Sequence, residues 1–476
     1  MSGKTLSIIS FSIVSIIGII FLGWWHTLYP YKELMVHIPG MDGRAIFIKP
    51  TKEDVVIGKY FKHFEDITYN LPGSWPRFRG SYFDNRSREG AVIRSKWENI
   101  NPEILWSVEL GEGHAGPAVH RGRVYLLDYD ESKRSDVLRC LSLKNGREIW
   151  RRWYSVKLKR NHGMSRTVPA VTDEYVVTIG PKCHIMCVDA LSGDFKWGVD
   201  LEKEYSTEVP MWYTAQCPLI DNSIAVIAPG GTALMIGVDC KTGEVLWETP
   251  NPDKWKMSHS SIMPMVLEGK KMYVYCALGG IFGVAAEGSD RGKMLWKSSE
   301  WNNAVIVPSP VIFSDGRIFV TAGYGAGSMM LKVDKIRENF TVKIINSWSP
   351  KESLACEQQT PILYNGYLYG ILPKDAGPNR MQFVCYNPDG GLVWASGKMN
   401  LFGLGPFILA DDKFFILKDD GVLTVAEASS NAYKPFVSYK LLDGRDAWAP
   451  LAIAGRRLLL RDSKKLVCID VGIRGE

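Results

Sequence analysis

The sequence predicts an all-β fold, an eight-bladed β-propeller with four antiparallel strands in each blade. An aromatic residue recurs at intervals of 44 to 52 residues, and self-similarity at such a period is typical of arrays and closed rings. In five copies a turn glycine precedes a tryptophan by four residues: Gly146/Trp150, Gly193/Trp197, Gly243/Trp247, Gly292/Trp296 and Gly390/Trp394. Trp106, Trp348 and Tyr439 extend the series to eight members.

A second recurring residue, a proline, gives the same number of units. One proline opens the first predicted strand of each unit: Pro117, Pro169, Pro218, Pro264, Pro310, Pro361, Pro406 and Pro450. Proline cannot donate to a sheet ladder, so it belongs at a strand start or on an unpaired edge. The innermost strand of a propeller blade has such an edge, which faces the central channel.

Composition agrees with this fold and argues against nucleic acid as a partner. With 46% hydrophobic residues, 45 glycines and 25 prolines, the chain favours a large core of short strands joined by tight turns. The net charge of +6 comes from 57 basic and 51 acidic residues spread along the chain. No basic block or stripe marks a nucleic-acid surface.

The nine cysteines are predicted to be free buried thiols. Their number is odd, no CxxC pair occurs, and most lie in apolar runs typical of strands. Cys183 and Cys187 lie four apart on a predicted strand, which places their Cα atoms about 13 Å apart, beyond the reach of a disulfide. The cysteines therefore do not indicate a compartment.

Residues 1–30 are predicted to be a signal anchor with a single transmembrane helix. Leu6 to Trp25 is a run of 20 residues without a charge, which is long enough to span a bilayer. Trp24, Trp25, Tyr29 and Tyr31 follow like an interfacial aromatic belt, and no small-residue cleavage site follows the run. We therefore expect an inner-membrane protein whose propeller lies in the periplasm.

Residues 31–103 are predicted to be a juxtamembrane segment followed by a clasp. Thr51 is expected to cap a short helix with an apolar face made of Ile57, Tyr60, Phe61, Phe64 and Ile67. The stretch from Gly73 to Gly80, Gly-Ser-Trp-Pro-Arg-Phe-Arg-Gly, is too rich in Pro and Gly for the interior of an element. It is too aromatic for a plain linker, so we interpret it as a clasp on the main domain.

Residues 104–476 form the predicted propeller, and the third blade shows the pattern most clearly. Four strands are predicted there, at 216–220, 223–228, 233–239 and 244–249, with turns between them at Asp221-Asn222, Pro229-Gly231 and Lys241-Gly243. Blades five and seven depart from the pattern. In blade seven Tyr439 replaces the tryptophan, which predicts a weaker contact with the neighbouring blade.

The ring is predicted to close through its N-terminal strand. The last unit has only three strands of its own, at 451–453, 458–461 and 466–470. The stretch Ile104 to Leu110 has the character of a fourth strand and carries the missing tryptophan, Trp106. Pairing the two would remove the open edges that a sheet presents to aggregation.

Polar and aromatic side chains gather in the connections that precede the eight prolines, around one mouth of the channel. A concave funnel with convergent polar groups is the default place for a ligand. The alternative is that these groups satisfy one another and ordered water. The predicted ligand site consists of His162, Arg166, Trp212, Gln216, His259, Glu357, Gln359 and Trp448.

The repeat resembles that of a known family. Asp189-Ala-Leu-Ser-Gly-Asp-Phe-Lys-Trp197 and Asp239-Cys-Lys-Thr-Gly-Glu-Val-Leu-Trp247 are similar to the tryptophan-docking motif of pyrroloquinoline-quinone-like (quinoprotein) eight-bladed propellers. That family includes quinone-dependent alcohol and glucose dehydrogenases, and also the non-catalytic BamB-like outer-membrane assembly lipoproteins. A lipobox cysteine is missing after the apolar run, so kinship with BamB is expected to be architectural.

The resemblance leaves two functions open. In the dehydrogenases, the quinone lies between a tryptophan and a disulfide of adjacent cysteines, beside a calcium ion; no two cysteines are adjacent here. Trp212 or Trp448 could form the stacking floor, and Glu208, Glu357 or Asp446 could bind calcium or accept a proton. We therefore expect a membrane-anchored periplasmic scaffold that binds a protein or a ligand, with no committed catalytic residue, cofactor or metal. The alternative is a pyrroloquinoline-quinone-dependent oxidoreductase with its site in the funnel.

Overall fold

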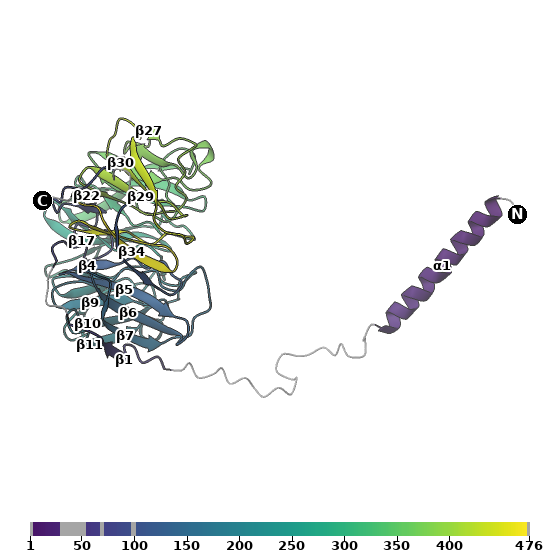
Figure 1. Cartoon of the computed structure of the whole chain (residues 1–476), viewed down its shortest axis with the longest axis horizontal. Coiled ribbons are helices and arrows are strands. Elements are labelled where there is room, and N and C mark those ends of the chain that lie inside the picture. The colour runs from purple at the N-terminus through teal and green to yellow at the C-terminus, as the bar shows by residue number, and fades with distance from the viewer. Residues whose placement is uncertain (1–2, 29–53, 67–70, 97–100, 474–476) are drawn as a thin grey trace. The chain divides into compact units, whose positions relative to one another are not determined.

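The computed structural model describes residues 3–28, 54–66, 71–96 and 101–473 (Figure 1). The chain divides into two compact units, residues 1–54 and residues 55–476, and each is described by itself. The first unit contains one helix, α1 (Gly3–Leu28), whose described side chains from Phe11 to Thr27 are exposed.

Among the residues that the structure describes, no helix combines the length and the apolar character that crossing a membrane requires. The structure therefore does not support the membrane span predicted over residues 6–25. Thr51, predicted to cap a helix, lies outside the described residues.

The second unit is all-β, and its described residues form eight antiparallel blades. The first two blades contain β4 (Ala118–His120), β5 (Arg123–Asp130), β6 (Ser135–Ser142) and β7 (Glu148–Ser155), then β8 (Ala170–Val171), β9 (Tyr175–Ile179), β10 (His184–Asp189) and β11 (Phe195–Asp200). The next two contain β12 (Leu219–Asp221), β13 (Ile224–Ile227), β14 (Ala233–Asp239) and β15 (Val245–Pro250), then β16 (Met263–Leu267), β17 (Lys270–Ala277), β18 (Gly280–Ala285) and β19 (Met294–Ser298).

The second half of the ring repeats the arrangement. Blades five and six contain β20 (Val311–Ile312), β21 (Arg317–Ala322), β22 (Gly327–Ile336) and β23 (Asn339–Trp348), then β24 (Ile362–Tyr364), β25 (Tyr367–Ile371), β26 (Phe383–Tyr386) and β27 (Leu392–Ala395). Blade seven contains β28 (Phe407–Ala410), β29 (Lys413–Leu417), β30 (Val422–Glu427) and β31 (Pro435–Lys440). Blade eight contains β32 (Ala452–Ala454), β33 (Arg457–Arg461), β34 (Lys465–Asp470) and β3 (Ile104–Glu109). Two short helical segments, α2 (Leu201–Glu204) and η1 (Gly377–Asn379), lie in connections.

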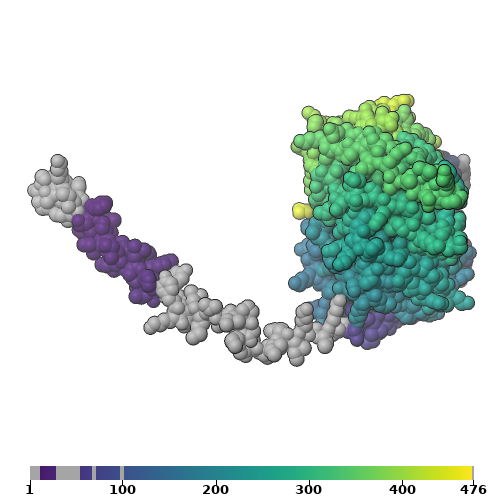
Figure 2. Space-filling model, turned by 180° about the vertical axis from the view of Figure 1, so that it is seen from behind, coloured from purple at the N-terminus to yellow at the C-terminus, as the bar shows by residue number. Residues whose placement is uncertain are grey.

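Blade eight closes the ring as the sequence predicts. β3 pairs antiparallel with β34, and Trp106 lies opposite Cys468. Figure 1 shows the yellow β34 beside the blue blade that contains β4, and β32 contacts β4. In Figure 2 the blue surface of the early blades continues into the teal and green surface of the later ones. The fourth strand of the last blade thus comes from the N-terminal side of the propeller.

The recurrent tryptophans join successive blades, which explains the recurrent glycines. A Cβ atom on Gly193, in blade two, would lie 2.6 Å from the ring of Trp150, in blade one. A Cβ on Gly243 would lie 2.7 Å from Trp197 in the same way. Both glycines have positive φ angles, +74° and +78°, which glycine adopts without strain. Each turn glycine therefore receives the tryptophan of the preceding blade.

Hydrogen bonds fix these joints. The indole N–H of Trp150 donates to the carbonyl of Leu191 at 3.0 Å, and that of Trp197 donates to the carbonyl of Cys240 at 2.9 Å. In the turn of blade three the Asp239 carboxylate accepts the backbone N–H groups of Lys241 and Thr242, both at 2.8 Å. The aspartate of the repeat thus shapes the turn on which the neighbouring tryptophan packs.

The prediction of a helix is wrong for residues 57–66, and Ile67 lies outside the described residues. Residues 60–63 form β1 (Tyr60–His63), which adds a fifth, outer strand to blade one by pairing antiparallel with β7. Tyr60 stacks on Trp153 with ring centroids 5.6 Å apart, and the Arg152 guanidinium lies over the Phe61 ring. Because β7 offers an unpaired edge and an aromatic surface, pairing outweighs the weak helical spacing of the apolar residues.

The predicted clasp crosses the inner strands of the ring. Trp75 exchanges two backbone hydrogen bonds with Val119 of β4, at 2.7 and 2.8 Å, and is only 2% exposed. Arg79 is buried, and its guanidinium donates to the carbonyl oxygens of Phe83, Thr360 and Pro361. A short strand, β2 (Arg86–Ser87), then pairs in parallel with β28 of blade seven. The clasp, residues 73–94, thus links blades one, six and seven.

All nine cysteines are buried free thiols, as predicted.

Candidate functional site

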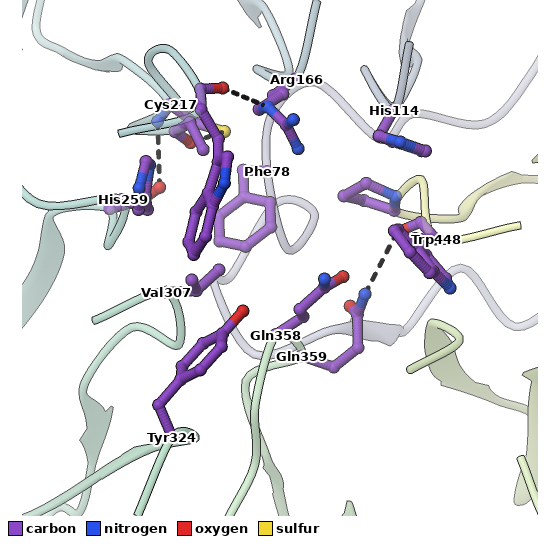
Figure 3. A pocket seen from close by; sticks show the side chains of 14 residues that line it. Phe78, His114, Arg166, Cys217, His259, Val307, Tyr324, Gln358, Gln359 and Trp448 are labelled. Atoms are coloured by element: carbon purple, nitrogen blue, oxygen red, sulfur yellow. Dashed lines mark hydrogen bonds between the residues drawn. The ribbon is translucent and has the colours of Figure 1, made fainter. Parts of the chain in front are cut away.

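A cavity of about 110 Å³ lies at the mouth of the channel, where the connections into the first strands converge. We call it the mouth pocket. Its lining residues come from the clasp and from seven blades: Phe78, His114, Arg166, Trp212, Ala215, Cys217, His259, Ser261, Val307, Tyr324, Gln358, Gln359, Trp448 and Pro450. Figure 3 shows the Phe78 ring at the centre of this view, surrounded by the polar and aromatic side chains.

Arg166 is the positive charge of the mouth pocket. Its Nε donates to the Trp212 carbonyl at 2.6 Å, and one terminal nitrogen donates to the carbonyls of Asn161 and His162 at 3.0 and 2.6 Å. Among the described residues no carboxylate forms an ion pair with it. Burial lowers the pKa of Arg166 to about 10, so it still carries its charge at neutral pH. The pocket therefore holds a half-buried cation, and among the described residues only carbonyl dipoles and tyrosines compensate its charge.

Two buried histidines of the mouth pocket have lowered pKa values. Burial, reinforced by the charge of Arg166, lowers the pKa of His259 to about 4. The same causes, with Arg461 added, lower the pKa of His114 to about 3. Each side chain is 8% exposed, and each has an Nδ1 atom without a hydrogen-bond partner. Both rings are therefore neutral at pH 7, and Arg166 dominates the charge on this side of the pocket.

Aromatic rings form one wall of the pocket. Trp212 lies 6.0 Å from His259 and 5.9 Å from Tyr324 between ring centroids, with interplanar angles of 25° and 28°. Trp212 and its neighbour Tyr213 have positive φ angles, 66° and 73°, and the bond from Arg166 holds the Trp212 carbonyl. Positive φ is strained for bulky residues, and such strain concentrates where a side chain must be positioned.

The opposite wall is polar and carries acidic groups behind it. Gln359 donates to the Trp448 carbonyl at 3.2 Å, as Figure 3 shows, and the Trp448 indole donates to Asp419 at 2.8 Å. Burial raises the pKa of Glu357 and that of Asp419 above their ordinary values. Burial, reinforced by the neighbouring Glu357 carboxylate, raises the pKa of Tyr324.

The structure brings five of the eight predicted site residues into the lining of the mouth pocket: Arg166, Trp212, His259, Gln359 and Trp448. The other three lie elsewhere. The His162 carbonyl accepts a hydrogen bond from Arg166, and Glu357 lies beside the lining residue Gln358. Gln216 is fully buried and bonds both the Ala228 backbone and the Tyr275 hydroxyl, so it has a structural role.

Two important lining residues were not predicted for the site. Tyr324 lies in the connection between β21 and β22, and Phe78 belongs to the clasp. In an up-and-down blade the connection between the second and third strands emerges on the same face as the connection into the first strand. That rule could have identified Tyr324, whereas no repeat pattern includes the clasp.

The residues present do not fit the quinone and calcium set that the resemblance implies. Cys217, the only cysteine lining the mouth pocket, is a buried free thiol that accepts the Val168 N–H. Glu208, one predicted calcium ligand, forms an ion pair with Lys256 at 2.8 Å. In the described part of the chain no cluster of three or more histidine, cysteine or acidic side chains could hold a metal ion. No catalytic step follows from these residues.

One family model and several solved structures are similar to this chain. The family model described as "Outer membrane protein assembly factor BamB" matches residues 133–378, more than half of the chain. Among solved structures, BamB from Moraxella catarrhalis has a TM-score of 0.52 and 12% identity, covering 78% of this chain and all of that one. A europium-containing methanol dehydrogenase has a TM-score of 0.56 and 14% identity, covering 84% and 90%. At such identities these structures show the fold alone.

Two curated relatives are similar in sequence over shorter stretches, and both come from Pseudomonas putida. Quinohemoprotein alcohol dehydrogenase ADH IIB is 26% identical over 201 residues, which is 40% of this chain and 27% of that protein. Quinoprotein alcohol dehydrogenase PedH is 25% identical over 170 residues, 34% of this chain and 27% of that protein. The matches thus span about a quarter of either relative.

Proposed function

We propose, from the premise that the chain belongs to the family of outer membrane protein assembly factor BamB, that it is a binding scaffold whose mouth pocket holds an anionic group. The group is a carboxylate, carried by a small molecule or by a partner protein. The relatives of this family support a binding role, and the charge of the pocket supports the class of ligand. The periplasmic location stays a prediction, which cell fractionation would test.

The observation that carries this proposal is the uncompensated charge of Arg166. Removing a cation from water costs several kcal/mol unless a counter-charge and hydrogen bonds replace the lost hydration. Here carbonyl oxygens satisfy Nε and one terminal nitrogen, and no described carboxylate pairs with the guanidinium. A carboxylate bound beside the aromatic wall would provide the counter-charge and the hydrogen-bond acceptors that the Arg166 guanidinium lacks.

The experiment titrates the purified protein with benzoate, 2-naphthoate and N-acetylglutamate, and follows tryptophan fluorescence, to which Trp212 and Trp448 contribute. We expect saturable binding of at least one carboxylate. Arg166→Met should weaken it by at least about tenfold, because a hydrogen bond to a charged group contributes about 1.5–3 kcal/mol. Arg166→Lys should restore part of the affinity.

The matched control is Arg337→Met, which removes an exposed arginine from the turn between β22 and β23. This variant should bind like the wild type. The proposal is refuted if none of the carboxylates binds, or if Arg166→Met binds as tightly as Arg337→Met.

A quinone-dependent oxidoreductase is the second candidate, and the similarity to two quinone-dependent alcohol dehydrogenases favours it. It is tested by adding pyrroloquinoline quinone and calcium to the purified protein, then recording the absorbance and the dye-linked oxidation of alcohols and sugars. Stoichiometric uptake with turnover would establish this function in place of the scaffold. Absence of both would eliminate it.

A further inference from the structure

The clasp binds the same backbone position in three successive blades. Trp75 exchanges hydrogen bonds with Val119, the Pro76 carbonyl accepts the Val171 N–H at 2.8 Å, and Arg77 donates to the Ile220 carbonyl at 3.2 Å. These three partners each lie two residues after the proline that opens a first strand. Their backbone groups point into the channel, so the inner edges of blades one to three are occupied by the chain itself.

The equivalent positions in the next two blades are Val266 and Ile312. Neither forms a hydrogen bond with the clasp in the described structure, and Val266 is 60% exposed. In blade five, Phe313 donates its N–H to Arg317 within the blade. Because N–H groups alternate sides along an antiparallel strand, that of Ile312 points to the channel. Two inner edges therefore remain open where the pattern of the clasp would continue.

A cavity of about 410 Å³ lies beside these open edges, between clasp residues 79–88 and residues 263–266 and 310–314, with Leu363 at one side. We call it the clasp groove. Val266, Ile312 and Leu363 give it an apolar surface, with Met263, Met265 and Phe313 buried behind them. It lies at the inner strands and shares no lining residue with the mouth pocket.

The clasp side of this groove is basic. Arg79, Arg86 and Arg88 line it together with a single acid, Asp84. Asp84 is paired with Arg88, and Arg79 is engaged by three carbonyls. Arg86 lies 4.7 Å from the centre of the Tyr364 ring, its Nε has no hydrogen-bond partner, and no described carboxylate pairs with it. The groove thus carries an excess of positive charge next to unpaired strand edges.

We propose that the clasp groove binds an extended acidic segment of a partner protein by strand addition. The segment pairs its backbone with Val266 or Ile312, as the clasp does with Val119 in blade one. Alternate apolar side chains rest on Val266, Ile312 and Leu363, and a carboxylate faces Arg86. Strand addition obtains its affinity from main-chain hydrogen bonds and its selectivity from side-chain pockets.

The experiment uses the full chain and three pools of hexapeptides with alternating apolar and charged residues: an acidic pool, a basic pool, and the acidic pool with every second amide N-methylated. Hydrogen exchange is measured at residues 263–267 and 310–313. We expect the acidic pool to slow exchange of the Val266 or Ile312 amide by at least about tenfold, since an unpaired edge amide becomes hydrogen-bonded. The other two pools should leave it unchanged.

Two variants separate binding from folding. Val266→Pro removes the edge N–H at a position where proline is tolerated, and should abolish protection at that blade while leaving the urea midpoint close to that of the wild type. Arg86→Gln should reduce binding of the acidic pool about tenfold or more, with Arg86→Lys recovering part and Arg337→Gln having no effect. Lack of protection by the acidic pool overturns the proposal, as does equal protection by the basic or N-methylated pool.

Discussion

Gly193 provides the sharpest test of how the blades are joined. An alanine Cβ there would lie 2.6 Å from Cδ2 and 2.8 Å from Cε3 of Trp150, a ring with no exposed surface. Overpacking of this kind costs about 1–3 kcal/mol. The positive φ of +74° adds about 1–2 kcal/mol for a residue with a Cβ. Gly193→Ala should therefore lower the free energy of unfolding by about 2–5 kcal/mol.

Gly366 is the matched control, because its φ is +81° and nothing lies within 4 Å of an added Cβ. Gly366→Ala should cost only the backbone part, about 1–2 kcal/mol. Urea unfolding followed by circular dichroism gives the change in the free energy of unfolding for both variants, provided that its dependence on urea concentration is the same as in the wild type. The reasoning fails if Gly193→Ala is no more destabilising than Gly366→Ala, or if the Trp150→Leu background does not reduce the cost of Gly193→Ala.

Three further changes test other contacts. Arg79→Met should speed proteolysis within residues 73–94, because three carbonyls lose a charged donor, and an unchanged rate would show that the clasp does not depend on this side chain. Arg461→Met should cost about 2–4 kcal/mol in urea unfolding, because the fully buried guanidinium donates to Gly111 and Ala115 across the junction of blades eight and one. The pKa of His259 is about 4 in the fold and 6.5 ordinarily, so the unfolded chain binds more protons and stability is lost as pH falls from about 6.5 to 4. Between pH 7 and pH 4 the free energy of unfolding should therefore fall less for His259→Asn than for the wild type, as urea unfolding at pH 7, 5 and 4 would show. An equal decrease in the two proteins would contradict the lowered pKa of His259.

The repeat could be predicted from the sequence because a closed ring imposes one spacing on every joint. The sequence places the glycine and tryptophan of one motif, such as Gly243 and Trp247, four residues apart. In the structure they belong to two joints, since Gly243 receives Trp197 and Trp247 packs against Gly292. Periodicity shows that contacts recur, but it does not show which copies touch.

The segment before the propeller could not be predicted in the same way. Tyr60 and Phe61 occur once, outside any repeat, and their spacing is compatible with a helix or a strand. The unpaired edge of β7 decides between the two, and that edge exists only in the folded blade. Here a tertiary contact, and not the local sequence pattern, determines the secondary structure.

The candidate site was predictable to the extent that it follows the repeat. Arg166, Trp212 and His259 precede first strands, and they meet because all such connections emerge on one face. Gln216 occupies the same kind of position, but its side chain turns into the blade to satisfy the Ala228 backbone. Side-chain direction at such positions depends on which backbone groups lack partners, and the sequence does not display that.

Because β3 closes the ring, it cannot pair until the last strand of the chain has been synthesised. β3 ends at Glu109, and its partner β34 begins at Lys465, so more than 350 residues must be synthesised between the two. At about 5–20 residues per second, β3 waits roughly 20–70 s for its partner during translation. For that interval Trp106 and a strand edge stay available to other chains. We expect the cell to protect this strand until synthesis ends, and slower translation to raise the yield of aggregated protein.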